Sequence, residues 1–392
     1  MKNIIPAVLI ALTASVFKAA AWDYEGHHAV NELALAALPT NFPAFILEPA
    51  TRDRIAFLAG EADRWRNVTD LKTGRDLALG HVSGPDHYID LEDLKDYDVK
   101  PEALPPLRYD FVALIAKARA AHPESFAPID PSKDSDHTRE LSGFLPWAIT
   151  ENFEKLQSGF AALAAFEKSG GTPAEIANAK ADIVYVMGVM GHFVGDASQP
   201  LHTTKHHHGW VTNAVAGNPN HYTTSFKFHS WIDGGFFGKT GGIDVKKLSA
   251  KIHTAEKIPR AEQQNGIFNN AIQFIVEANK LVEPLYILDR DGKLSNKENR
   301  GAEGRAFLEA QLVKSGQLLG DIWFTAWATA PEDTFLEKQL ETRAATASEK
   351  SAAEKPAADL PVEIKEAVKK SATELPAVQE LQSQLPATPK PQ

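Results

Sequence analysis

The sequence has no cysteine among its 392 residues. This absence excludes disulfide bonds and thiolate metal ligands, so stability must come from a large core, from bound metal, or from both. After the first 21 residues the chain also lacks any apolar run of transmembrane length, so we expect a soluble mature protein. An excess of basic charge is missing too: the net charge is −10. That charge argues against a generally basic nucleic-acid-binding surface, but it leaves phosphate substrates open because bound metal reverses the local sign.

Residues 1–21 have the pattern of a secretory signal peptide. Lys2 supplies the positive charge, residues 4–17 form the apolar stretch, and residues 19–21 are the small residues that signal peptidase accepts. Cleavage between Ala21 and Trp22 gives Trp22 a free amino group. We therefore predict an exported protein, periplasmic or extracellular, that begins at Trp22.

Residues 22–335 have the composition of one large globular domain. Apolar residues recur there at helical spacing, and few stretches alternate as strands do. We predict an all-α fold: a single domain of six to nine helices with long loops at 203–224 and 235–243. The tail at 342–392 is rich in Ala, Glu, Lys and Pro, and we predict that it is disordered. The predicted helical stretches are the one after His27 and those at 111–121, 149–166, 183–193, 268–281 and 308–323.

Histidine and aspartate recur along the domain in a pattern that indicates metal ligands. His192 and Asp196 are four residues apart in an apolar helical stretch, so their side chains share one face. A buried aspartate is costly unless it is paired, and a metal ion is an effective partner. One such pair alone is more often structural, but His229 and Asp233 repeat the spacing. The complete row of candidate ligands is Trp22, His27, Asp63, His87, His192, Asp196, His202, His229 and Asp233.

Five segments of the chain resemble the secreted zinc-dependent single-strand nucleases, the type I nucleases. These enzymes share a superfamily with bacterial zinc-dependent phospholipase C. The similarity follows the order of the family's motifs and spans about residues 22–330. The segments are WDYEGH at 22–27, EADRWR at 61–66, HYIDLED at 87–93, GHFVGDASQPLH at 191–202 and HSWID at 229–233.

The resemblance implies three zinc ions, two of them a close pair bridged by one aspartate. It also gives the signal cleavage a chemical purpose, because an amide nitrogen is a poor zinc donor and an amino nitrogen is a good one. The implied ligands are Asp63, His87 and His192 for one ion of the pair, His27 with the amino nitrogen and carbonyl oxygen of Trp22 for the other, Asp196 as the bridge, and His202, His229 and Asp233 for the third ion.

The reaction that the resemblance implies is hydrolysis of a phosphate ester by metal-activated water. Asp63 would orient the water and accept its proton. Arg66 would either donate two parallel hydrogen bonds to the phosphoryl oxygens or form only a surface ion pair. In the nuclease branch, the residues that match Tyr88 and Asp90 help to hold a base, although Tyr88 could equally be core packing. The Gly-Gly-Asn loop of that branch is absent here, and we interpret the histidine run at 206–208 as solvated or as an adventitious metal binder.

We therefore expect an exported trinuclear-zinc phosphodiesterase that cuts single-stranded DNA and RNA, with 3′-nucleotidase activity as a further expectation. Nucleic acid or nucleotides would be its substrates, and no protein partner is implied. The alternative is a zinc-dependent phospholipase C acting on phospholipid, although Asp233, where that branch has glutamate, favours the nuclease. A lesser alternative is a non-catalytic zinc-binding protein, which the histidine run motivates.

Overall fold

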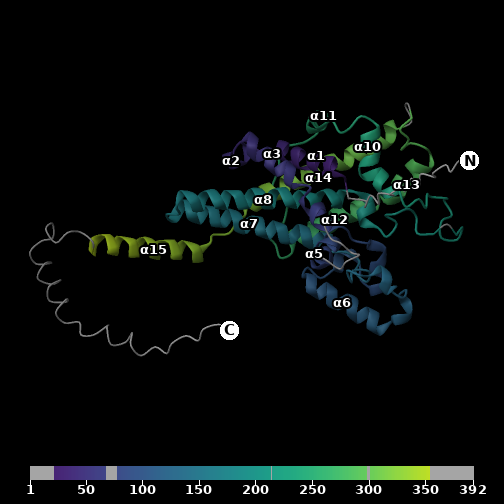
Figure 1. Ribbon diagram of the computed structural model, residues 1–392, viewed down its shortest axis with the longest axis horizontal. Coiled ribbons are helices and arrows are strands. Elements are labelled where there is room, and N and C mark those ends of the chain that lie inside the picture. Colours follow the sequence, from purple (N-terminus) through teal and green to yellow (C-terminus); the bar gives the residue numbers. More distant parts are fainter. Residues whose placement is uncertain (1–21, 68–76, 213, 298–300, 354–392) are drawn as a thin grey trace, which may run out of the picture.

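The computed structural model describes residues 22–67, 77–212, 214–297 and 301–353, and every regular element in these ranges is a helix (Figure 1). The predicted all-α fold is confirmed. The predicted number of six to nine helices is wrong: the described residues form 15 α-helices, because short turns such as α2, α9, α10 and α11 have no periodic apolar pattern of their own. The predicted signal peptide and residues 354–392 of the predicted tail lie outside the described residues. No helix in the described ranges is both long and apolar enough to cross a bilayer.

Two long helices form the axis of the molecule. α7 (Leu145–Ser169) and α8 (Pro173–Ser198) run side by side in Figure 1 as an antiparallel hairpin. The turn between them follows from the sequence. Gly170 takes a left-handed conformation with φ of 87°, which suits the residue that ends a helix. Thr172 and Glu175 then form a capping box that starts α8.

Helices from both ends of the chain cover this hairpin. α1 (Tyr24–Ala37) packs along α14 (Ala302–Ala328), and both contact α8, as does α3 (Pro49–Leu58). α1 and α14 approach closely because α14 carries Gly316 and Gly320, where any side chain would collide with α1. The first described helix is therefore locked against the middle and the end of the domain.

Most of the remaining elements surround the end of the hairpin that carries the C-terminus of α8, whereas α2 lies beside the other half, where Phe45 contacts Lys180 of α8. Among the described residues of the predicted loop at 203–224, only Thr203 is helical, as the last residue of the 3-10 helix η6 (Pro200–Thr203). The loop predicted at 235–243 contains the short helix α10 (Phe236–Lys239). The elements are α2 (Ala44–Leu47), α4 (Glu61–Asn67), α5 (Leu77–Ser83), η1 (Gly84–His87), η2 (Leu91–Tyr97), η3 (Pro101–Ala103), α6 (Arg108–Ala121), η4 (Pro123–Ser125), η5 (Pro131–Lys133), η6 (Pro200–Thr203), α9 (Phe228–Ser230), η7 (Trp231–Gly235), α10 (Phe236–Lys239), α11 (Val245–Ser249), α12 (Gly266–Asn279) and α13 (Val282–Arg290).

The last described helix differs from the sequence-based prediction. α15 (Thr334–Ala353) passes the predicted domain end at 335, so residues 342–353 are helical and not disordered. Alanine, glutamate and lysine favour helix, and the first proline of the tail comes only at 356. Arg343 also fixes α15 to the turn of the hairpin, because its guanidinium donates to Glu175 and to the carbonyl of Gly170.

Candidate metal centre

The last two turns of α8 carry the centre of the candidate site. His192 and Asp196 are fully buried there, one turn apart on one face of the helix. Gly195 lies against α1, and a Cβ at this position would come within 2.8 Å of His27 Nδ1. The glycine therefore makes room for the imidazole of His27 beside the two α8 residues.

A first group of candidate ligands comes from three separate elements: Asp63 from α4, His87 from η1 and His192 from α8. His192 Nε2 lies 3.0 Å from His87 Nδ1 and 3.8 Å from Asp63 Oδ1. His87 Nδ1 lies 4.0 Å from the same oxygen of Asp63. The three donor atoms thus face a common point.

Asp196 connects this group to a second one, made by His27, His192 and Asp196 itself. Its Oδ2 lies 3.1 Å from His87 Nδ1 and 3.5 Å from His192 Nε2. Its Oδ1 lies 3.4 Å from His27 Nε2. The two carboxylate oxygens therefore face different imidazoles, which is the arrangement of a carboxylate that bridges two ions.

Trp22 lies against the same end of α8. Its side chain is fully buried, and its indole Nε1 donates a hydrogen bond of 3.0 Å to the carbonyl of Gly195. The next residue, Asp23, donates its backbone N–H to the carbonyl of Asp233 at 3.1 Å. The start of the described chain is thus held between two parts of the site. The amino nitrogen of Trp22 as a metal ligand stays a prediction.

His202, His229 and Asp233 form the third group. His229 Nε2 lies 3.0 Å from His202 Nε2 and 3.3 Å from Asp233 Oδ2. His229 belongs to α9, whereas Asp233 belongs to η7, a π-helical segment between α9 and α10. π-Helical turns within α-helical stretches occur frequently at functional sites.

Backbone carbonyl groups orient two of these histidines. His192 Nδ1 lies 2.7 Å from the carbonyl oxygen of Ala59, and His202 Nδ1 lies 2.6 Å from that of His87. A carbonyl oxygen only accepts hydrogen bonds, so each Nδ1 carries the hydrogen and each Nε2 has a lone pair directed at its group. Histidines that bind metal are almost always held in this way.

Gln199 orients an aspartate of the third group, and the sequence analysis missed it. Its Nε2 donates to Asp233 Oδ1 at 2.6 Å, and its Oε1 accepts the backbone N–H of Leu201 at 2.7 Å. Because Oδ1 is engaged, Asp233 Oδ2 remains for the group itself. The available signal was the position of Gln199 between two candidate ligands, Asp196 and His202.

The spacing and the chemistry of these atoms suit bound cations. Ligands at about 2.0–2.2 Å from a tetrahedral ion lie roughly 3.3–3.6 Å apart, and the separations given above run from 3.0 to 4.0 Å. The buried oxygens Asp196 Oδ1 and Asp233 Oδ2 have no hydrogen-bond partner among the described residues. A buried carboxylate oxygen without a donor is costly, and a metal ion removes that cost.

Burial determines the protonation states of the site. It lowers the pKa of His202 to about 3 and lowers the pKa of His87 and of His229 well below 6.5. It raises the pKa of Asp196 and of Asp233 well above 3.8. The imidazoles are therefore neutral, which is the form that binds metal, and the carboxylates need nearby positive charge to ionise.

Arg66 is the cationic side chain of the site. Its Nη2 lies 2.7 Å from Asp63 Oδ1, and the two side chains are 23% and 12% exposed. Its charge is a further cause, after burial, of the lowered pKa of His87. The pair is therefore part of the wall of the site and differs from a fully exposed surface ion pair.

Tyr88 and Asp90 flank a backbone contact to the third group. The residue between them, Ile89, donates its N–H to the carbonyl of His202 at 2.9 Å. Burial raises the pKa of Tyr88 and of Asp90. Asp90 Oδ1 accepts no hydrogen bond among the described residues and lies 4.0 Å from His207 Nδ1. The role of both residues toward a substrate stays a prediction.

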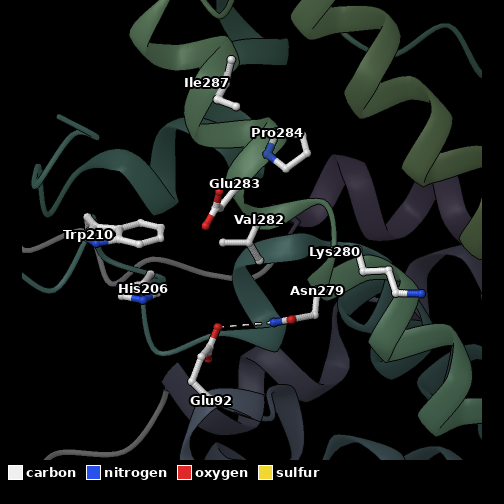
Figure 2. A pocket seen from close by; sticks show the side chains of 9 residues that line it. All are labelled: Glu92, His206, Trp210, Asn279, Lys280, Val282, Glu283, Pro284 and Ile287. Carbon is white, nitrogen blue, oxygen red and sulfur yellow. Dashed lines mark hydrogen bonds between the residues drawn. The ribbon is translucent and has the colours of Figure 1, made fainter. Parts of the chain in front are cut away.

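The run of three histidines is half-buried and divides between two sites, which differs from the solvated loop of the sequence-based prediction. His206 stacks on Trp210 with ring centroids 3.8 Å apart, and both line a separate cavity of about 590 Å³, shown in Figure 2. The ring centroids of His207 and His208 lie 5.9 and 5.2 Å from that of His229. Two of the three rings therefore belong to the surroundings of the third group.

The described chain thus contains three buried His/Asp groups that could each hold a metal ion. They bring together every predicted side-chain ligand, namely His27, Asp63, His87, His192, Asp196, His202, His229 and Asp233. In comparisons with protein-family models, curated proteins and solved structures, nothing matches this chain.

Proposed function

We propose that this protein is an exported, zinc-dependent phosphodiesterase that hydrolyses single-stranded DNA and RNA. The observation that carries the proposal is the arrangement of Asp196, whose two oxygens face different histidines, beside a third group of ligands. Neutral imidazoles and carboxylates without thiolates are a donor set of zinc enzymes. Several adjacent ions also suit a dianionic or polyanionic substrate in a protein whose net charge is −10.

Each group would hold one ion. Asp63, His87 and His192 would bind the first, His27 with the backbone of Trp22 would bind the second, and Asp196 would bridge them. The third ion would lie between the remaining ligands. When bound, zinc supplies Lewis acidity, which makes water nucleophilic near neutral pH and stabilises charge on the phosphoryl group. The ligands of the third ion would be His202, His229 and Asp233.

The side chains around the ions would perform the remaining steps. Asp63 Oδ2 can accept a proton from the attacking water while Oδ1 faces the first group. Arg66 can exchange its contact with Asp63 for two parallel hydrogen bonds to the phosphoryl oxygens. Tyr88 would stack on a base, which gives binding without strict sequence preference, and Asp90 would accept a hydrogen bond from it.

Export would complete the second group. Signal cleavage before Trp22 changes an amide nitrogen into an amine that can bind metal. The buried indole already holds this residue beside Gly195, so the new amino group would be generated close to His27 and Asp196. We therefore place the active protein in the periplasm or outside the cell.

Cleavage of defined substrates tests the proposal. The mature protein beginning at Trp22 is incubated with single-stranded DNA, single-stranded RNA and 3′-phosphorylated nucleosides, with and without a chelator. Chelator-sensitive cleavage that returns when zinc is added supports the proposal. The Asp196→Asn variant serves as the matched control for a contaminating nuclease. Absence of cleavage by a protein that contains zinc would refute it.

One observation favours the alternative, a phospholipase C. A cavity of about 850 Å³ has an apolar side formed by residues such as Val82, Tyr109 and Phe193, together with charged residues such as Asp86 and Arg108. The Phe193 ring centroid lies 5.8 Å from those of His87 and His192. Such a cavity suits an acyl chain better than a nucleotide. Release of diacylglycerol from lecithin, with inert single-stranded DNA, would favour this alternative over the nuclease.

A further inference from the structure

The cavity of Figure 2 is separate from the candidate metal groups. Its volume is about 590 Å³, and none of the residues that line it belongs to a buried His/Asp group. Glu92 of η2 and Glu283 of α13 enter it from different sides, and their carboxylates point toward the same space. The buried side chain of Val282 lies between them (Figure 2). An apolar surface therefore separates two acidic groups inside one cavity.

The contacts of the two carboxylates leave their negative charge uncompensated. Glu92 accepts hydrogen bonds from the hydroxyl of Thr204 at 2.7 Å and from the backbone N–H of Lys205 at 3.2 Å. Glu283 accepts one from the hydroxyl of Tyr222 at 3.4 Å. All three donors are uncharged. Among the residues that the structure describes, neither carboxylate has an ion-pair partner.

The other polar side chains of the lining do not neutralise this charge. Lys280 lines the cavity, but its ammonium pairs with Glu277 at 2.5 Å and points away from both acids in Figure 2. Burial lowers the pKa of His206 below its ordinary 6.5, so the imidazole is neutral at neutral pH. This ring stacks on Trp210, which forms the adjoining wall. The cavity thus combines two negative charges with apolar and aromatic surface.

We propose that this cavity binds an aliphatic diammonium ion, which is a chain of methylene groups with an ammonium group at each end. One ammonium would donate to Glu92 and the other to Glu283. The methylene chain would cover Val282 and remove its apolar surface from water. The inference goes beyond the proposed function, because such binding requires neither zinc nor a phosphate ester.

The donor set of the cavity favours an organic cation over a metal ion. Calcium takes six to eight oxygen ligands, which is more than two carboxylates provide. Zinc would require imidazole nitrogens close to the carboxylates, and the described groups that could hold a metal include neither Glu92 nor Glu283. Glu92 is also held in place by its hydrogen bonds before a ligand arrives, which lowers the cost of ordering it on binding.

Calorimetric titration tests the inference. The zinc-loaded mature protein is titrated at neutral pH with linear diaminoalkanes of increasing length, with hexanediol as the uncharged analogue and with hexylamine as the analogue of single charge. We expect affinity to be highest at the chain length that spans the two acids. Glu283→Gln and Glu92→Gln should each weaken binding of that diamine about three- to tenfold, the usual range for one partly exposed charged contact.

A matched control separates the cavity from the general attraction of an acidic protein for cations. Glu154 is an exposed glutamate of α7 that does not line the cavity. Glu154→Gln removes the same charge as Glu283→Gln and should bind the diamine as the wild type does. Zinc content is measured before and after each titration, because an unprotonated amine also binds zinc.

Three outcomes would overturn the inference. The first is wild-type affinity of Glu283→Gln for the diamine, and the second is equal weakening in Glu154→Gln, which would mean that the cation binds to the surface at large. The third is an equal affinity for hexylamine, because a single ammonium would then suffice. Cleavage of single strands is measured separately, so failure of the diamine site and failure of the proposed function are distinguishable.

Discussion

Asp196 differs from the other aspartates of the site in the use of its two oxygens. One oxygen faces His27, and the other faces His87 and His192, so this single carboxylate contacts members of both the first and the second group. Asp233 uses one oxygen toward its group and gives the other to Gln199. Both residues are buried, but Asp196 faces the candidate ligands of two ions and Asp233 faces those of one.

The contrast predicts different losses of metal. Asp196→Asn should weaken binding in the first and second groups, whereas Asp233→Asn should affect the third group only. Both losses should exceed the ~10–100-fold effect of removing a hydrogen-bond partner of a ligand, because a ligand itself is changed. Elemental analysis of the purified variants measures this. Equal metal contents in the two variants would contradict the bridging role of Asp196.

The elements that carry the site depend on close approach of their backbones. A Cβ at Gly191 of α8 would collide with Asn31 Oδ1 on α1. Asn31 Nδ2 donates to the carbonyl of Ile55 at 2.8 Å and to that of Gly188 at 2.9 Å. One buried amide therefore joins α1, α3 and α8 behind the histidines, and it leaves no space for a larger residue.

Gly191→Ala should therefore lower the free energy of unfolding by about 1–3 kcal/mol, the usual cost of overpacking. Gly238→Ala in α10 is the matched control, since nothing lies within 4 Å of a Cβ there. That change should be neutral or should stabilise by up to about 1 kcal/mol, because alanine favours helix more than glycine does. Urea unfolding of the two metal-free variants gives the comparison. A neutral effect at Gly191 would argue against the tight helix contact.

α15 should be attached to the hairpin in a pH-dependent way. Hydrogen bonds from Arg343 are the main cause that lowers the pKa of Glu175 from its ordinary 4.5 to about 2. An acid with a lowered pKa stabilises the folded state above its ordinary pKa, and this contribution is lost as the pH falls from about 4.5 to about 2. The protection of α15 amides from hydrogen exchange, taken relative to the intrinsic exchange rate at each pH, should fall over that range. Glu175→Gln should show the lower protection at every pH, and pH-independent protection in the wild type would contradict the prediction.

At the scale of the whole molecule, the candidate ligands tie distant parts of the chain together. α1, α4, η1, α8, η6, α9 and η7 each contribute at least one residue to a buried group. A bound ion stabilises the folded state by mass action, by about 2.7 kcal/mol when its free concentration is 100 times its Kd. Because the chain has no disulfide bonds, bound metal ions would be the cross-links between these distant segments.

Removal of metal should therefore destabilise the entire domain. We expect a chelator to lower the Tm of the mature protein, and we expect stoichiometric zinc to restore it. Scanning calorimetry with and without chelator measures the shift. Because the metal-free core remains extensive, the protein should still unfold cooperatively. An unchanged Tm in a protein shown to have lost its metal would mean that the ions contribute little to stability.

Much of the fold could be predicted from periodicity. The helices at 149–166 and 183–193 were predicted because their apolar residues recur every three or four positions, and both belong to longer helices in the structure. The helical start of the tail was missed, because its composition resembles that of disordered segments. α15 contacts residues far away along the chain, such as Glu175, which pairs with Arg343 across 168 positions, and local composition does not reveal such contacts. Gln199 was not predicted either, because no sequence pattern marks an amide side chain that orients a metal ligand.

The order of residues along the chain by itself determined the helical class and the pairing of His192 with Asp196, because a separation of four residues on one helix requires no other part of the protein. Only the tertiary structure decided that Asp63 and His87 come within 4.0 Å of His192. It alone also decided that the rings of His207 and His208 lie near His229, whereas His206 stacks on Trp210. Local periodicity sets the direction of a side chain relative to its own helix. The packing of separate helices sets which side chains meet.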